Sequence, residues 1–437
     1  MALNNNNDNI GETAPASTKR LLIAILSTIA LADFGLGLNT VVLPLYAKSL
    51  GASIITIGLI IAAFGLARIL VNIPVSIISK KLKSQYIHIG MLFIFLGAAG
   101  YLLSTAYYQL FIFRFLEGFG SGIINTSSMI ILTKHLYRDE KRGKVLSRYM
   151  IARRLSMGSA PFLGAVVAYE FTDKAAFLLY TVIMLIGLII AFYNKKFLNN
   201  IKIPETADKF ASEPDGNTNE PGNKERKGNK GYFKKYSALL YDLNFIALCF
   251  LTFSFFFSRI GSRRELVPLV GVSVMNLNKA SIGLLISISA VIGVVLTYYS
   301  DKVINIMGVK KSIITSFIIS AAGVLSFIIF KNLFTFGASI ILISAGGGFS
   351  GPARNLYLMD SVDKNHYDEA IGIYRTLSDL GFVLGPFAVG AVFYYFNFIS
   401  AYSLVAVVIT CAAIIFGLFA KSYDNRPPMR LNSGLNE

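Results

Sequence analysis

Long runs of hydrophobic residues recur along the whole chain and alternate with short polar segments. Each run holds about 20 residues, enough for an α-helix to cross the roughly 30 Å hydrocarbon layer of a membrane. The runs lack the regular alternation of apolar and polar positions that marks membrane β-strands. The pattern therefore predicts an all-α protein that crosses a membrane many times.

The runs predict twelve membrane-spanning helices in two sets of six. The first six spans cover residues 21–46, 54–79, 86–106, 108–133, 147–169 and 175–193. The last six cover residues 239–261, 280–300, 311–330, 334–359, 369–395 and 399–420. A charged segment rich in Gly, Asn and Pro lies between them and has too little apolar surface to form a core. The predicted parts are an N-terminal tail (1–20), a six-helix half (21–196), a flexible cytoplasmic linker (197–236), a second six-helix half (237–420) and a C-terminal tail (421–437).

The two halves resemble each other, which predicts a pseudo-symmetric pair. LPLYAKSLGASIITIGLI (43–60) is similar to VPLVGVSVMNLNKASIGLL (267–285), and RRLSMGSAPFLGAVVAY (153–169) is similar to SDLGFVLGPFAVGAVFYY (378–395). Aligning Pro161 with Pro386 places Arg154 opposite Asp379. Repeated six-helix halves are typical of secondary transporters, in which the substrate path lies at the interface between the halves.

Charge and composition refine this picture. The chain is 54% hydrophobic and carries a net charge of +17. In a soluble protein such a charge would suggest a nucleic-acid partner, but here Lys and Arg concentrate in alternate loops between spans. Positive charge in membrane proteins gathers in cytoplasmic loops. We therefore expect no nucleic-acid partner, a location in the cell (plasma) membrane, and both termini in the cytoplasm.

No motif of an enzyme, an ATP-driven pump or a metal site stands out. The sequence has no Walker A loop. Its three histidines are scattered near the loops, and its two cysteines are isolated within apolar runs. We therefore expect neither catalysis nor a cofactor nor a bound metal.

Three motifs resemble those of the major facilitator superfamily. RFLEGFGSG (114–122) resembles the family's span-4 motif Arg-x-x-Gln-Gly-x-Gly, with Glu117 where Gln is common. LGPFAVG (384–390), with MGSAPFLG (157–164) as a weaker copy, resembles the Gly-Pro-rich span-5 motif of antiporters. YYSDKVINIMGVKK (298–311) resembles the loop after span 8. The chain is identified as a member of this superfamily on these motifs, over the whole region from span 1 to span 12.

Other segments narrow the resemblance or depart from it. IYRTLSDLGFVLGPFAVG (373–390) and FGLARILVNIP (64–74) look like the drug:proton antiporter branch. The loop after span 2, IPVSIISKKLKSQY (73–86), lacks the acidic residue and the glycines that the family usually has there. The corresponding cytoplasmic loop motif of the second half keeps an acidic residue but has a longer spacing. Its residues are Asp301, Lys302 and Gly308. The family resemblance also implies a monomer.

Charged residues inside the predicted spans are functional candidates, because a charge in the membrane interior is costly and needs a partner or a wet cavity. They are Asp33, Arg68, Arg114, Glu117, Arg153, Arg154, Arg259, Arg354, Arg375 and Asp379. At 1.5 Å per residue, Asp33 lies roughly 20 Å past Arg20, and Arg114 lies roughly 9 Å from the outer edge. The two depths nearly coincide, so an Asp33–Arg114 pair across the cavity is expected.

Proton coupling is the role predicted for this pair. In the antiporters that the chain resembles, a span-1 carboxylate and the span-4 arginine take part in it. A carboxylate in a low dielectric holds its proton more tightly, and a nearby guanidinium opposes that effect, so moving either one changes proton binding. Glu117 is either a second proton site or a tether that pairs with Arg114 at i, i+3.

Five other charges are candidate gates or substrate contacts: Arg68, Arg154, Arg259, Arg375 and Asp379. Arg259 and the run Arg263-Arg264-Glu265 are predicted near the outer end of span 7, as an outer gate or as interfacial charges. Arg354 is predicted at the cytoplasmic rim of span 10. Candidate hinges come from prolines with nearby glycines in spans 5 and 11. They are Pro161, Gly164, Gly385 and Pro386.

Three functions follow as hypotheses. The first is a secondary transporter that exports small organic compounds in exchange for protons by alternating access. The second is an importer or facilitator of a small metabolite or organic anion, because arginines outnumber acids inside the spans. The third is a membrane receptor or scaffold, which predicts neither an internal repeat nor buried charge pairs. The expected partners are the lipid bilayer, a small-molecule substrate and protons.

Overall fold

A computed structural model describes residues 14–78, 86–135, 142–199, 239, 241–362 and 367–423. In this part of the chain every regular element is a helix. The first group is α1 (Ala14–Ser49), α2 (Ile54–Ile78), α3 (Tyr86–Leu103), α4 (Tyr107–His135), α5 (Arg142–Glu170) and α6 (Asp173–Asn199). The second group is α9 (Leu243–Gly261), the π-helical turn η1 (Ser262–Leu266), α10 (Val267–Ser273), α11 (Lys279–Tyr298), α12 (Ser300–Met307), α13 (Val309–Phe330), α14 (Leu333–Ser361), α15 (Tyr367–Tyr395) and α16 (Phe398–Phe419).

Within these residues, ten stretches are long and apolar enough to cross a membrane, which confirms an all-α multi-pass protein. Helices α4 and α5 have 29 residues each but are not among the ten. Both carry polar and charged residues along their length, including Arg114 in α4 and Arg153 in α5. The predicted linker lies outside the described residues, except for residues 197–199, which extend α6.

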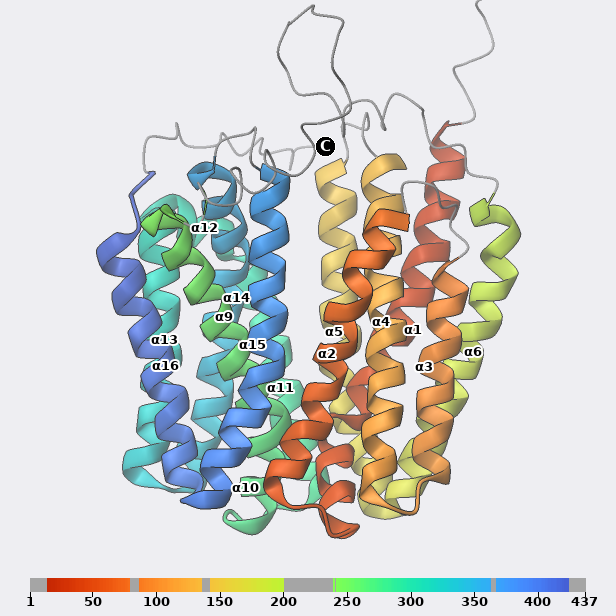
Figure 1. The fold of residues 1–437 in the computed structure, drawn as a ribbon, viewed down its shortest axis with the longest axis horizontal. Helices are drawn as coiled ribbons and strands as arrows, with labels where there is room; N and C mark the ends of the chain where they lie inside the picture. Colours follow the sequence, from red (N-terminus) through yellow and green to blue (C-terminus); the bar gives the residue numbers. More distant parts are fainter. Residues whose placement is uncertain are drawn as a thin grey trace, which may run out of the picture.

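The helices form two bundles that stand side by side (Figure 1). Helices α1–α6 make the first bundle and α9–α16 the second. Helix α2 packs against α15, and α5 packs against α11. The two bundles lie close together at the end where α10 is found and diverge toward the end where α12 is found (Figure 1). We refer to these as the α10 end and the α12 end.

Two close backbone contacts hold the bundles together. A Cβ atom placed on Gly58 of α2 would lie 2.6 Å from the carbonyl oxygen of Pro386 in α15. A Cβ atom on Gly283 of α11 would lie 2.7 Å from the carbonyl oxygen of Pro161 in α5. Only glycine allows backbones to approach this closely. Both prolines therefore lie at the interface between the bundles, inside helices that continue through them.

Span 7 is longer than the sequence predicted. The apolar run was expected to end at residue 261, but the helical path continues through η1 and α10 to Ser273, as one stretch of 31 residues. The polar residues of η1 interrupt the hydrophobic run without ending the span, because they pack inside the protein. Pro268 lies in the first turn of α10, where its missing N–H costs little. The charges of η1 are thus well inside the span and not at its outer end, which corrects the prediction.

Candidate functional site

Glu117 is the centre of a buried polar network in the first bundle. Its carboxylate accepts hydrogen bonds from Asn39 Nδ2 (3.0 Å) and from the hydroxyls of Tyr101 (2.7 Å) and Tyr180 (2.6 Å). Arg114 Nη1 donates to it as well, at 2.5 Å, in an i, i+3 ion pair. These donors come from α1, α3, α4 and α6. Because Glu117 is 0% exposed and every partner is supplied by the protein, the network ties four helices together.

Asp33 does not pair with Arg114 but with Arg153, which corrects the expected pair. Arg153 Nε lies 2.6 Å from Asp33 Oδ2, and Nη2 lies 3.3 Å from Oδ1. A depth estimate places a residue along a helix but does not say which neighbour its side chain faces. Helix α1 packs along α5, whereas α4 packs mainly against α2 and α3. Arg114 instead meets Glu117 and lies over the Phe64 ring, 4.7 Å from its centroid.

Arg153 was named among the intramembrane charges without a role, and the repeat drew attention to Arg154 instead. Adjacent residues of a helix point to different faces. The helical prediction for this span therefore already implies that Arg153 and Arg154 have different neighbours. The Asp33 carboxylate is buried, but the Arg153 side chain is 27% exposed. The pair is thus more exposed on its arginine side.

Two polar contacts join the bundles somewhat nearer to the α12 end than to the α10 end. Arg68 of α2 pairs with Asp379 of α15 at 3.2 Å. Arg154 of α5 donates a hydrogen bond to the Thr297 hydroxyl of α11. The repeat aligns Arg154 with Asp379. The two residues therefore join the bundles at equivalent positions, Arg154 where α5 meets α11 and Asp379 where α15 meets α2. Their predicted role as gates or substrate contacts stays a prediction.

Toward the α10 end, η1 inserts two charged side chains between the bundles. A Cβ on Gly58 would lie 2.9 Å from Glu265 Oε1, and Gly390 flanks the same oxygen. Glu265 is 0% exposed, and neither carboxylate oxygen has a hydrogen-bond partner among the described residues. The Arg264 guanidinium lies 5.7 Å from the centroids of both Phe64 and Phe382, which stack on each other across the interface.

A salt bridge also links the bundles at the α10 end itself. Lys279 Nζ, at the first residue of α11, lies 2.5 Å from Asp173 Oδ1, at the first residue of α6. Together with the glycine contacts and η1, this salt bridge connects the bundles over the whole α10-end half of their interface.

Arg259 lies at the centre of a group of arginines. Arg154, Arg263 and Arg354 are near enough to it for mutual electrostatic repulsion. Arg354 is buried in the second bundle and lies over the Phe255 ring, 3.8 Å from its centroid. This differs from the rim position expected for Arg354, because its side chain turns toward α9.

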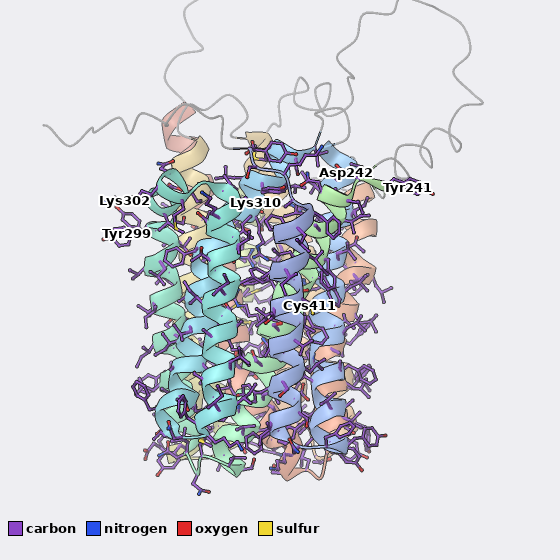
Figure 2. The ribbon with its side chains drawn as sticks, turned by 90° about the vertical axis from the view of Figure 1, so that its left-hand side faces the viewer. Tyr241, Asp242, Tyr299, Lys302, Lys310 and Cys411 are labelled. Carbon is purple, nitrogen blue, oxygen red and sulfur yellow. The ribbon has the colours of Figure 1, made fainter. Side chains whose placement is uncertain are left out.

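The remaining predicted residues are dispersed. Arg375 is exposed on α15. The predicted loop motif is the short helix α12, with Asp301 and Lys302 exposed in its first turn and Gly308 at φ 80° after its end. Figure 2 shows Lys302 and Tyr299 at the α12 end, the same end as Asp242.

The hinge candidates lie at sites of tight packing. Besides the two prolines at the interface, Gly164 lies against the Leu38 carbonyl and Gly385 against the Phe257 carbonyl. Their predicted role as hinges stays a prediction. Within the described residues, no group of three His, Cys, Asp or Glu side chains could hold a metal ion.

Comparison with known proteins places this geometry among membrane transporters. A family model described as Major Facilitator Superfamily matches residues 25–306 and 266–437. An uncharacterized MFS-type transporter of Methanocaldococcus jannaschii is 23% identical over 82% of this chain and 86% of its own length. A multi-drug resistance efflux pump PmrA homolog of Lactococcus lactis is 27% identical over 43% of this chain and 48% of its own length.

Solved structures share the fold. The crystal structure of the nucleoside transporter NupG has a TM-score of 0.72 at 13% identity, and the match covers 92% of this chain and 100% of that chain. A bacterial homolog to the human lysosomal transporter Spinster, in an inward-facing and occupied conformation, has a TM-score of 0.71 at 14% identity, with 94% and 99% coverage. The matching family and these relatives are transporters and not enzymes.

Proposed function

Because the chain belongs to the major facilitator superfamily, we propose that it is a secondary transporter that exports small organic compounds in exchange for protons. The similarity to an efflux pump homologue supports export and the drug:proton antiporter branch. The observation that carries proton coupling is the Asp33–Arg153 pair, in which a buried carboxylate meets a partly exposed guanidinium. Proton-coupled transport needs such a group, because one site must bind and release a proton as the cavity changes sides.

The proposal includes the arrangement in the membrane. Helices α4 and α5 would complete twelve spans, and the halves 21–196 and 237–420 would be related by pseudo-symmetry. The contacts of Gly58 with Pro386 and of Gly283 with Pro161 support this relation, because Gly283 follows Gly58 by 225 residues and Pro386 follows Pro161 by the same 225 residues. The protein would lie in the plasma membrane as a monomer. Its α12 end and both termini would face the cytoplasm.

In this arrangement the described conformation is closed toward the outside and opens toward the cytoplasm. Outward opening would separate Asp173 from Lys279 and withdraw Gly58 from Glu265. Arg68 with Asp379, and Arg154 with Thr297, would form the ties about which the halves rock. Pro161 and Pro386 would act as hinges, since each lies at a close backbone contact between the two halves.

Asp33 is a better proton carrier than Glu117. Protonation of Asp33 breaks one ion pair, and Arg153 can turn toward the adjoining space, since its side chain is partly exposed. Protonation of Glu117 would disturb four hydrogen bonds in a site closed to water. We therefore propose that Asp33 carries the coupled proton, and that Glu117 with Arg114 keeps the first bundle in the shape that coupling requires.

Proton-driven exchange in proteoliposomes tests the function. The purified protein would be reconstituted with a pH-sensitive dye inside and challenged with small aromatic amines, sulfonates and neutral analogues. We expect at least one class to move protons in the opposite direction, and Asp33→Asn to abolish this movement. Glu170→Gln, which changes an exposed carboxylate at the end of α5, is the control and should transport normally. Unchanged coupling in Asp33→Asn would exclude the proton role of that residue.

Import or facilitated passage of a small metabolite is the second candidate. It is favoured by the excess of arginines over acids inside the described helices. The same vesicles decide between the two, because a facilitator would move its substrate down its own gradient at equal internal and external pH.

A further inference from the structure

Four arginines gather where the two bundles face each other. Arg154 comes from α5 of the first bundle, Arg259 and Arg263 from α9 and η1, and Arg354 from α14. We call them the arginine cluster. Arg259 is repelled by the other three, and Arg354 is also repelled by Arg154. A Cβ on Gly351 would lie 3.0 Å from Arg154 Nη2, so the first bundle reaches α14 at this point.

No acid offsets these charges within the described residues. The ion pairs there are Arg68–Asp379, Arg114–Glu117, Arg153–Asp33 and Lys279–Asp173, and none involves the arginine cluster. Its members bind only neutral groups: Arg263 donates to the Ile286 carbonyl (3.2 Å) and Arg354 to the Ser350 carbonyl (3.2 Å). Four like charges without a counter-charge in a membrane interior are costly, so a negative ligand would be strongly stabilised there.

Several buried donors in the same place have no partner in the part of the chain that the structure describes. Nη1 of Arg354 is one of them, on a side chain that is 4% exposed. The hydroxyls of Ser258 and Ser350 are also buried and unpartnered. Both serines line a small cavity together with Phe255, Arg259 and Ser320, and apolar side chains of α13, α14 and α16 complete its wall. Buried polar groups normally have partners, so this set of donors indicates a place for an acceptor.

We propose that the arginine cluster binds the anionic group of the transported compound, a carboxylate, sulfonate or phosphate attached to an aromatic or apolar body. Guanidinium groups present paired N–H donors that match such oxygens, and the Phe255 ring next to Arg354 places an aromatic side chain beside these donors. This inference rests on the proposed transport function and names its substrate class. Because Arg154 belongs to one bundle and the other three to the second, a bound anion bridges both halves and links binding to their movement.

Binding to the purified full-length protein in neutral detergent tests this without any gradient. The probes are naphthalene-2-sulfonate and its uncharged analogue naphthalene-2-sulfonamide, measured by titration calorimetry and by the shift of the unfolding temperature. We expect the sulfonate alone to bind and to raise the unfolding temperature. Arg259→Gln should weaken its binding about 10- to 100-fold, the equivalent of one or two lost charged hydrogen bonds.

Two further variants keep the result interpretable. Arg259→Lys retains the charge with fewer donors and should recover part of the affinity, which a merely misfolded site would not do. Lys331→Gln removes a positive charge from an exposed position between α13 and α14 and should bind like the unmodified protein. Equal binding of the sulfonate and the sulfonamide, or unchanged binding in Arg259→Gln, would overturn the proposal.

A lipid headgroup is the other possible source of such an anion. In nanodiscs of phosphatidylcholine we expect the sulfonate to bind, and replacing half of that lipid with phosphatidylglycerol should leave its affinity unchanged. Loss of binding in phosphatidylglycerol would overturn the assignment to a transported compound. Failure of anion binding can be distinguished from failure of the proposed proton coupling, because proton-driven transport of cationic or neutral compounds could persist when no anion binds.

Discussion

Arg153 and Asp33 join α5 to α1 through two hydrogen bonds, the shorter one 2.6 Å between Nε and Oδ2. This contact, and not the pairing of Asp33 with Arg114, brings a span-1 carboxylate together with an arginine. It also distinguishes two kinds of acid in the first bundle. The acid that faces Arg153 has a partly exposed partner, whereas Glu117 is enclosed by four donors.

Removing one member of the Asp33–Arg153 pair should cost more than removing both. Arg153→Gln leaves a buried carboxylate without its cation, and we expect the free energy of unfolding to fall by about 1–3 kcal/mol. The double variant Asp33→Asn/Arg153→Gln should recover part of this loss. Thermal unfolding of all three variants in detergent measures the coupling. Additive losses would show that the two side chains do not stabilise each other.

Glu117→Gln should destabilise the protein, because the amide keeps the shape but leaves Arg114 without a counter-charge and offers one acceptor oxygen in place of two. We expect a loss of about 2–4 kcal/mol, measured by unfolding in detergent. Tyr180→Phe removes one donor to the same carboxylate and should cost about 1 kcal/mol. Tyr193→Phe, at an exposed position of the same helix α6, is the control and should change nothing.

Glu265→Gln should have the opposite effect from Glu117→Gln. Neither oxygen of Glu265 has a donor among the residues that the structure describes, so a negative charge there is costly and an uncharged amide of the same shape is tolerated. We expect the free energy of unfolding to stay the same or to rise by up to about 2 kcal/mol. A loss of stability as large as that of Glu117→Gln would contradict the placement of Glu265 at a site without donors.

A side chain at Gly58 should separate the bundles at the α10 end. Gly58→Val introduces atoms where the Pro386 carbonyl already lies, and the nearby Glu265 side chain leaves no space on the other side. Spin labels attached through Ser53→Cys and Phe396→Cys, with both native cysteines replaced, would report the distance between the bundles. We expect a longer distance than in the labelled parent.

Gly372→Ala is the control for this experiment, because no described atom outside its own helical turn lies within 4 Å of a Cβ placed there. It should leave the spin-label distance unchanged. If Gly58→Val also left the distance unchanged, the close contact of α2 with α15 would not hold the bundles together at this end.

Part of the site was predictable because it depends on local sequence. The i, i+3 spacing of Arg114 and Glu117 allows their ion pair on any helix. The alignment of Pro161 with Pro386 marked two positions that both lie at the interface between the bundles. The arginine cluster was not predictable in the same way, since its four members come from three separate segments, 154, 259–263 and 354, that only the packing of α5, α9 and α14 brings together.

An all-α membrane protein of many spans follows from the order of the amino acids alone. Apolar runs of this length must bury their backbone polar groups inside helices, whatever their neighbours are. Which charges meet, and where span 7 ends, depends on how the helices pack against each other. Hydrophobicity does not distinguish a side chain buried against protein from one facing lipid, so η1 looked like the end of a helix. Depth along a helix does not reveal which neighbour a side chain faces, so Asp33 was assigned to Arg114, while the packing of α1 against α5 gave it Arg153.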